Sequence, residues 1–358
     1  MVEYLIGRSV SLAETTNPLD KMDVLSEVLR LVKLEGALFF NAEFSAPWCL
    51  NTAQSNVLAP FLSPSAKHLI IYHFVTEGRA YARMLDGRRE ELFAGDIVVF
   101  PHGDAHYLGN GLPEQPVDAL RTFAEHLKHG MKLVHFGGGG EVTQFVCGFL
   151  ACDPRLCDVV LAALPAILKV HVSDEVSGQW IRNSIRFSVD EADGVTAGSN
   201  LVLARLSEVL FVETLRRYIN SLPAEQTGWL AGVRDPIVGK ALALMHEEPA
   251  RPWTVELLAR RVGASRTRFA AHFRYLLRQS PMAYLLSWRL KLGADILLSK
   301  DNSVAEIAAA VGYGSEAAFN RAFRRVFDCP PAQFRRTRRA ELGNPVAAAN
   351  EQPYAETA

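Results

Sequence analysis

The sequence has no run of about 18 or more apolar residues, the length that a helix needs to cross a bilayer, so no membrane span is predicted. Residues 1–20 have neither the basic start nor the apolar core of a secretory signal peptide. Cysteine is scarce and odd in number, with 5 in 358 residues, which argues against a disulfide framework. These absences together predict a protein of the reducing cytoplasm.

The chain as a whole also has no excess of positive charge, because its formal net charge is −1 at pH 7. Residues 235–340 differ, because they hold 18 Lys and Arg against 9 Asp and Glu, while the remainder holds 20 against 30. A basic part joined to an acidic part is typical of a protein in which only one part meets phosphate. The alternative is a cationic surface that is simply solvated.

Residues 254–334 contain one pattern twice. The first copy, residues 254–273, reads TVELLARRVGASRTRFAAHF, and the second, residues 303–323, reads SVAEIAAAVGYGSEAAFNRAF. Each copy has a helix-capping hydroxyl, a small residue where helices approach, a turn glycine, and a serine that caps a second helix. The paired positions are Thr254 and Ser303, Ala259 and Ala308, Gly263 and Gly312, and Ser265 and Ser315. The repeat predicts two helix-turn-helix units.

The second helix of each copy has a core face and an outward face. Phe269 and Phe273 recur at helical spacing, as do Phe319 and Phe323, and these aromatic residues are expected in the core. Arg and Asn read guanine and adenine edges, Glu accepts a hydrogen bond from cytosine, and small apolar groups contact thymine methyls. The outward residues predicted to contact DNA are Arg266, Thr267, Ala270, Ala271, Arg274, Glu316, Ala317, Asn320, Arg321 and Arg324.

This part of the chain resembles the DNA-binding domain of the AraC/XylS family of bacterial transcription regulators. The resemblance spans about residues 235–336 and includes the bridge PMAYLLSWRLKLGADILL (281–298) and the closing FDCPPAQFR (327–335). It implies that the helices after Ser265 and Ser315 are recognition helices that enter the major groove of promoter DNA. It also implies RNA polymerase as a further partner at the promoter.

Between residues 36 and 153 the pattern changes to short β-rich runs separated by Gly, Pro, Asp and Asn, which predicts a β barrel or sandwich. Residues 114–140 are expected to form a long, partly flexible excursion from it. The segment 95–110, GDIVVFPHGDAHYLGN, resembles the second motif of the cupin barrels, and more narrowly the cupin-type sensor domains of such regulators. The matching positions are Gly95, Pro101, Gly103, His106 and Asn110.

In the cupin enzymes, a first motif supplies two His and one Glu that complete the metal site. This sequence departs from that motif. His68 stands alone, and Ile71 occupies the register of the Glu, so only His106 remains of four ligands. We therefore expect no catalytic residue, no metal, no cofactor and no enzymatic activity. The alternative is a metal-dependent cupin enzyme fused to a DNA-binding module.

Three residues are candidates for contact with a small-molecule effector: His73, His106 and Cys147. Strand alternation places His73 on the barrel interior, His106 should point the same way, and Cys147 lies on a late strand. Two other interpretations stay open, namely a soft metal such as zinc and plain packing of a core histidine and a small thiol. Cys147, Cys152 and Cys157 also suggest a thiol redox sensor, although their spacing matches no common redox pattern.

From residue 154 the apolar period returns to that of helices. One broad apolar stripe within residues 197–219 is wider than packing on a barrel requires, so a homodimer through this region is predicted. Burial within the monomer is the alternative. The stripe consists of Val202, Leu203, Leu206, Val209, Leu210 and Val212.

The predicted architecture is an α+β multidomain chain with an N-terminal cupin-like β-barrel, a helical connector and a C-terminal all-α double helix-turn-helix. The predicted boundaries are 1–153 for the sensing domain, 154–234 for the connector, dimerisation region and linker, 235–340 for the DNA-binding domain, and 341–358 for a disordered tail. The predicted function is sequence-specific transcription regulation under the control of a small effector. A structural DNA-binding protein, which would show no preference between sequences, is the third class considered.

Overall fold

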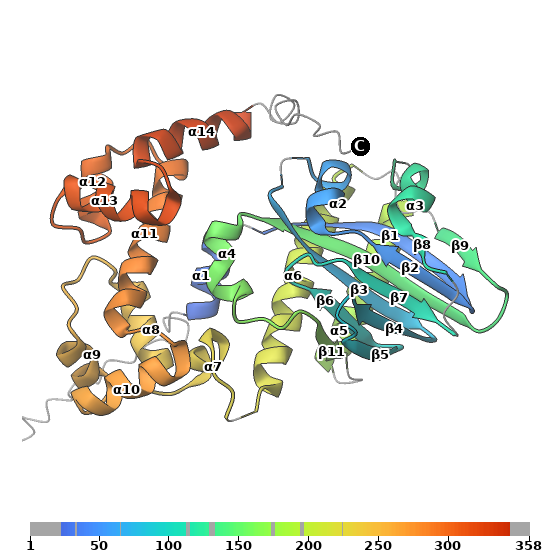
Figure 1. Ribbon diagram of the computed structural model, residues 1–358, viewed down its shortest axis with the longest axis horizontal. Coiled ribbons are helices and arrows are strands. Elements are labelled where there is room, and N and C mark those ends of the chain that lie inside the picture. Colours follow the sequence, from blue (N-terminus) through green and yellow to red (C-terminus); the bar gives the residue numbers. More distant parts are fainter. Residues whose placement is uncertain are drawn as a thin grey trace, which may run out of the picture.

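The computed structural model describes residues 23–32, 34–64, 66–111, 115–128, 133–172, 176–193, 197–223 and 225–343. Of the tail predicted to be disordered, 341–358, residues 341–343 are helical instead, and the rest lies outside the described residues. In Figure 1 a sheet-rich half lies on the right and a helical half on the left, with two short helices, α1 and α4, between them. None of the described helices is long and apolar enough to traverse a bilayer.

The sheet-rich half confirms the predicted cupin-type fold, but its described strands form two sheets rather than one closed ring. The strands are β1 (Glu35–Ser45), β2 (Trp48–Thr52), β3 (His68–Glu77), β4 (Arg79–Met84), β5 (Arg89–Phe93), β6 (Asp96–Phe100), β7 (His106–Asn110), β8 (Val117–Asp118), β9 (Leu133–Gly137), β10 (Val142–Cys152) and β11 (Leu168–His171). The six-stranded sheet has the order β11-β6-β3-β10-β1-β9, and the five-stranded sheet has the order β5-β4-β7-β2-β8.

Strand β3 lies inside the larger sheet and is covered on both faces, which explains its continuous apolar sequence. Val75 packs between the sheets with Phe44, Phe100 and other core residues. Tyr72 belongs to the cluster on the opposite face and donates a hydrogen bond to the Ser207 hydroxyl at 3.0 Å. The alternation predicted for this strand is therefore confirmed.

Six helices accompany the sheets in the described residues, and their bounds are α1 (Val24–Val32), α2 (Ser55–Leu62), α3 (Ala119–Lys128), α4 (Pro154–Leu161), α5 (Val176–Asp193) and α6 (Ser199–Ser221). The predicted excursion 114–140 contains β8, α3 and β9 in its described part. α6 packs on β1 and β10, and this contact buries Leu203 and Leu210. For these two leucines the alternative of burial within the monomer holds, whereas Val202 and Val209 are exposed.

The helical half confirms the predicted double helix-turn-helix. Its helices are α7 (Trp229–Arg234), α8 (Val238–Glu247), α9 (Val255–Arg261), α10 (Arg266–Leu277), α11 (Pro281–Ser299), α12 (Val304–Ala310), α13 (Glu316–Phe327) and α14 (Pro331–Gly343). We call α9 and α10 the first unit, and α12 and α13 the second unit. Both turn glycines, Gly263 and Gly312, have the left-handed backbone that the repeat predicts. The bridge helix α11 contributes buried residues to the cores of both units.

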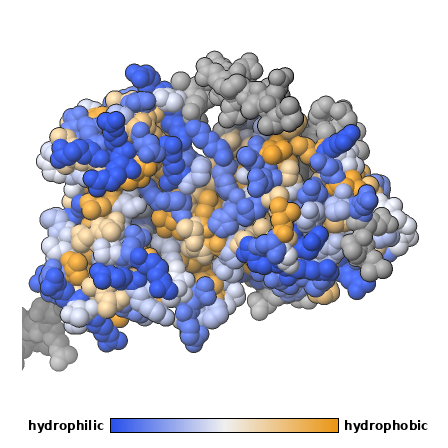
Figure 2. Space-filling view, in the orientation of Figure 1, coloured by the Kyte–Doolittle hydropathy of each residue, from blue (hydrophilic) through white to orange (hydrophobic). Residues whose placement is uncertain are grey.

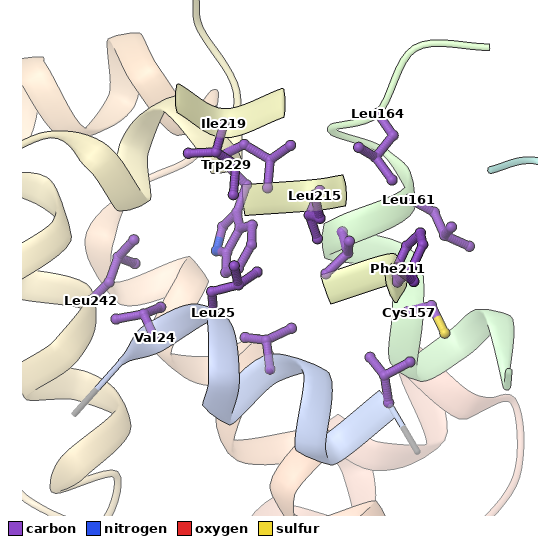
Figure 3. Packing of buried hydrophobic residues seen from close by; sticks show 14 of the residues in the cluster. Val24, Leu25, Cys157, Leu161, Leu164, Phe211, Leu215, Ile219, Trp229 and Leu242 are labelled. Carbon is purple, nitrogen blue, oxygen red and sulfur yellow. The ribbon is translucent and has the colours of Figure 1, made fainter. Parts of the chain in front are cut away.

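The two halves share one hydrophobic core, which Figure 3 shows from close by. Leu25 of α1 lies among residues of α6 and α7, including Leu215 and Trp229, while Leu242 of α8 lies on the other side of Trp229. Helix α1 therefore packs between the helices of the sheet-rich half and those next to the first unit. A continuous apolar interface of this kind fixes the relative position of the two halves.

Candidate DNA interface and effector site

Both recognition helices begin at a capping serine and are anchored by buried phenylalanines. Ser265 accepts a hydrogen bond from the Arg268 backbone N–H at 3.3 Å, and Ser315 accepts one from the Ala318 backbone N–H at 3.2 Å. The four aromatic anchors, Phe269, Phe273, Phe319 and Phe323, are fully buried, as predicted. This anchoring determines which side of each helix faces solvent.

The ten residues predicted to contact DNA all reach the surface. Eight are exposed, while Ala270 and Asn320 are half-buried. In Figure 2 hydrophilic residues cover most of the visible surface over α12 and α13. These faces are available to a duplex, as base readout requires.

The two units differ in electrostatics. Arg266 forms an ion pair with Glu256 of α9, so its guanidinium already has a counter-charge. In the second unit the Asn320 amide donates to the Glu316 carboxylate over 3.5 Å, which is at the limit of a hydrogen bond. Arg321 is exposed and has no ion pair in the described part of the chain. The guanidinium groups of Arg321 and Arg324 in the second unit, like that of Arg274 in the first, are therefore available to a base edge or phosphate.

A hollow beside the first unit is lined by the predicted Ala271 and by four residues that the sequence did not lead us to predict. It has a volume of about 360 Å³ and is lined by Ile237, Arg268, Ala271, His272 and Tyr275. The aromatic ring of Tyr275 is 53% exposed. Tyr275 lies four residues after the predicted Ala271, so helical spacing could have found it.

Helix α4 connects the sheet-rich half to α11, to the second unit and to α14 through four contacts. Arg155 donates to the backbone oxygen of Phe327, the last residue of α13, at 3.2 Å. Asp158 pairs with Lys291 of α11, and Asp153, the N-cap of α4, pairs with Arg338 of α14. Leu156 packs in the core of the second unit. Because β10 ends at Cys152, α4 continues directly from a central strand of the sheet.

The structure brings the three predicted effector residues together in one chain of hydrogen bonds. Cys147 Sγ lies 2.7 Å from His73 Nδ1, and His73 Nε2 lies 3.0 Å from His106 Nε2. His106 Nδ1 lies 2.9 Å from the backbone oxygen of Asp104. We call these residues the histidine chain.

The carbonyl end of the histidine chain determines where each proton lies. A carbonyl only accepts, so His106 Nδ1 carries a hydrogen and donates it to Asp104. In the neutral ring, His106 Nε2 then accepts from His73 Nε2, and His73 Nδ1 accepts from the Cys147 thiol. Every nitrogen of both imidazoles is therefore used within the protein.

Burial keeps all three side chains neutral near pH 7. It lowers the pKa of His73 well below its usual value, and the neighbouring His106 lowers it further. Burial also lowers the pKa of His106 to about 4, against the hydrogen bond to Asp104. The same cause raises the pKa of the Cys147 thiol, so the thiolate is disfavoured.

A cavity of about 50 Å³ lies between the sheets under helices α2 and α3. Its lining consists of Leu50, Thr52, Leu58, Leu62, His73, Leu108, Ala119, Leu120, Phe123, Phe145 and Cys147. His106 is not part of this lining but stacks on Phe100, with ring centroids 3.5 Å apart. We call this space the His73 cavity.

The metal that enzymatic cupins hold does not fit these donors. His73 contacts Cys147 through Nδ1 and His106 through Nε2, which are on different sides of the ring, so one ion could not bind all three residues. Two nitrogens are fewer than the three protein ligands of a catalytic zinc site. In the described part of the chain, no three His, Cys, Asp or Glu residues are grouped so that they could hold one metal ion.

The three thiols considered as a redox sensor do not lie together. Cys147 faces the core between the two sheets. Cys152 and Cys157 belong to the large core on the other side of the six-stranded sheet. A sensor that joins all three is therefore excluded by the alternation along β10.

These features define a class of protein: a cupin-type domain joined to a duplicated helix-turn-helix with exposed recognition faces. A cupin family model matches residues 23–220, and a helix-turn-helix domain model matches residues 258–337. The chain is 28% identical over 316 residues to the HTH-type transcriptional regulator AlkR of Acinetobacter baylyi, covering 88% of this chain and 99% of that protein. It is 30% identical over 318 residues to an AraC-like transcription regulator of Streptomyces lividans, covering 88% and 98%.

Among solved structures, the DNA-binding domain of AdpA in complex with a target DNA is 33% identical, covers 30% of this chain and 96% of that chain, and has a TM-score of 0.29. The matches over most of the chain identify the family. The chain belongs to the AraC-like family of DNA-binding transcription regulators and has an N-terminal cupin-type domain.

Proposed function

We propose that this regulator reads a specific promoter sequence through α10 and α13 and responds to a small molecule bound in the His73 cavity. The observation that carries the proposal is the pair of capped helices whose polar faces are left open by the rest of the protein. The ten outward residues predicted from the sequence to contact DNA are the proposed DNA contacts. Contact with RNA polymerase stays a prediction.

The connection between α4 and the DNA-binding helices supports control by the cupin-type domain. Cys147 lines the His73 cavity and lies on β10, and the same strand leads into α4. Helix α4 in turn contacts α11, α13 and α14. A shift of β10 on ligand binding would therefore act on the second unit through packed elements. We propose residues 1–153 as the sensing domain, 154–234 as the connector and 235–340 as the DNA-binding domain.

Arg321→Ala is expected to cost about 1–3 kcal/mol of binding free energy at the specific site, because a bidentate contact to a guanine edge is lost. Affinity for a random duplex should change far less. Binding of both duplexes is measured by fluorescence anisotropy at fixed salt. Arg88→Ala, which removes an exposed arginine of the sheet-rich half, serves as the control. Equal losses on specific and random DNA would show that Arg321 contacts phosphate.

We also propose a homodimer through exposed apolar residues of α5 and α6, to which the stripe predicted from the sequence contributes Val202 and Val209. Trp180 and Phe187 of α5 are 44% and 49% exposed, and Val202 and Val209 of α6 are 39% and 47% exposed. An exposed apolar surface of this kind marks an interaction site. Sedimentation should show a dimer at micromolar concentration without DNA, and Val209→Lys should convert it to monomer. A monomeric wild-type chain would contradict a stable dimer.

A further inference from the structure

The His73 cavity has an apolar wall with few groups that recognise a polar ligand. Of its eleven lining residues, eight are Leu, Ala or Phe, and none carries a formal charge. The three others are Thr52, His73 and Cys147. A charged ligand would lose its hydration here without gaining a counter-charge.

Of the three polar lining residues, His73 and Cys147 have little hydrogen-bonding capacity left, so the Thr52 hydroxyl is the remaining polar group. Both nitrogens of His73 are already occupied, by the Cys147 thiol on one side and by His106 on the other. The thiol hydrogen is used as well, which leaves the weakly accepting sulfur lone pairs toward the cavity. The idea that an imidazole here orients a polar or anionic ligand is therefore not supported, because the histidine chain satisfies itself.

The volume of the cavity limits the size of its occupant. One water needs about 10–15 Å³ by this measure, so the cavity of about 50 Å³ offers about four water-sized positions. An occupant of only a few heavy atoms therefore fits without movement of the lining. Helices α2 and α3 cover the space, since Leu58, Leu62, Ala119, Leu120 and Phe123 all belong to its lining. Apolar space of this kind favours apolar guests over water.

We infer that the effector of this regulator is a small, uncharged, apolar molecule, of which a short hydrocarbon chain is the simplest form. The inference rests on the proposed sensing function and specifies its ligand. The histidine chain is the neutral back wall of the cavity, and its role is to keep a buried polar cluster satisfied while apolar contacts provide the affinity.

The matched probes that test this inference are n-butane and sodium butyrate, which share a carbon chain and differ in charge. Binding of each to the full-length chain is measured by saturation-transfer NMR at pH 7.5. Butane should bind, and butyrate should bind at least 30-fold more weakly. Ala119→Leu and Leu62→Phe each add volume to the lining from a different helix, and either should weaken butane binding at least tenfold. Val57→Leu changes an exposed residue of α2 and should leave it unchanged.

The same samples are tested for affinity to the specific DNA duplex. A butane-dependent change of at least threefold, lost in the two filled variants, supports both the ligand class and the sensing function. Butane binding that is lost in the filled variants without any change in DNA affinity keeps the ligand class and overturns the sensing function. Butyrate binding that is lost in His73→Gln shows recognition by the imidazole and overturns the ligand class alone. Absence of binding by butane, or butane binding that survives in both filled variants, also overturns it.

Discussion

Phe319→Ala is expected to lower the free energy of unfolding of the second unit by about 3–5 kcal/mol, because it removes a large buried aromatic side chain. Phe319 is fully buried, and its ring centroid lies 5.3 Å from that of Tyr313 and 5.4 Å from that of Phe323. A Cβ on Gly293 would come within 2.8 Å of the Phe319 ring, so α11 approaches it closely. Truncation would leave a void under the recognition helix and loosen its position on α11.

The control for this variant lies seven residues further along the same helix. Val326 is 46% exposed, and Val326→Ala is expected to change stability by less than about 0.5 kcal/mol. Urea denaturation, with hydrogen exchange to locate the effect in α12 and α13, distinguishes the two. Specific DNA binding should fall with the stability of the second unit in Phe319→Ala. Similar stability for both variants would show that Phe319 is not the anchor of α13.

Much of the DNA-binding domain could be predicted because its determinants are local in sequence. The caps at Thr254 and Ser303 act within three residues, and each accepts the backbone hydrogen bond expected of it. The turn at Gly312 needs its left-handed backbone for a local reason as well. The core faces follow from helical spacing alone.

The proposed effector site could be predicted only as a set of residues. Alternation placed His73 on the interior, but its contact with Cys147 depends on pairing between strands that are 74 residues apart in sequence. The position of His106 behind His73, outside the cavity lining, follows from its stacking on Phe100. No local pattern reveals these relations. The docking of α4 on the second unit is also non-local, since Asp158 and Lys291 are 133 residues apart.

The apolar stripe of α6 shows a different limit. Periodicity correctly placed Leu203 and Leu210 on one face, but it could not tell a partner subunit from the protein's own sheet. Gly36 of β1 permits this contact, because a Cβ there would lie 2.6 Å from Ser207 Cβ of α6. The sequence shows the glycine, but only the packed structure shows that it allows α6 to approach β1.

Acidification below pH 6.5 is expected to destabilise both halves, because two fully or nearly fully buried histidines are neutral in the folded protein. The pKa of His106 is about 4 and that of His246 about 3, in both cases through burial. His246 stacks on Trp288 with ring centroids 3.7 Å apart, and its Nε2 lies 2.8 Å from the Tyr284 hydroxyl oxygen. Neither environment offers a counter-charge to an imidazolium among the contacts of the described residues.

The sign of the pH effect follows from proton uptake on unfolding. Both folded pKa values lie below the ordinary value of about 6.5, so the unfolded chain binds more protons and stability falls as pH decreases. The contribution of each histidine is complete above pH 6.5 and is lost down to the folded pKa. Between pH 6.5 and 4.5 each one should account for a loss of about 2 kcal/mol.

Hydrogen exchange at pH 7.5, 5.5 and 4.5, corrected for intrinsic rates, reports on the two sites separately, through the amides of β7 for His106 and of α8 for His246. Glutamine cannot take up a proton, so His106→Gln and His246→Gln should each reduce the pH dependence of its own half and leave the other half as in the wild type. In the sheet-rich half part of the slope remains, because burial also lowers the pKa of His73. His135→Gln, whose side chain is 66% exposed, is the control and should leave both slopes as they are. Two outcomes would contradict this prediction: amide protection that stays constant from pH 6.5 to 4.5, or the same pH dependence of protection in both Gln variants as in the wild type. Either would mean that the imidazoles gain a stabilising partner on protonation. The expected loss instead makes the neutral histidine chain a condition for the folded state of the cupin-type domain, and so for the apolar cavity beside it.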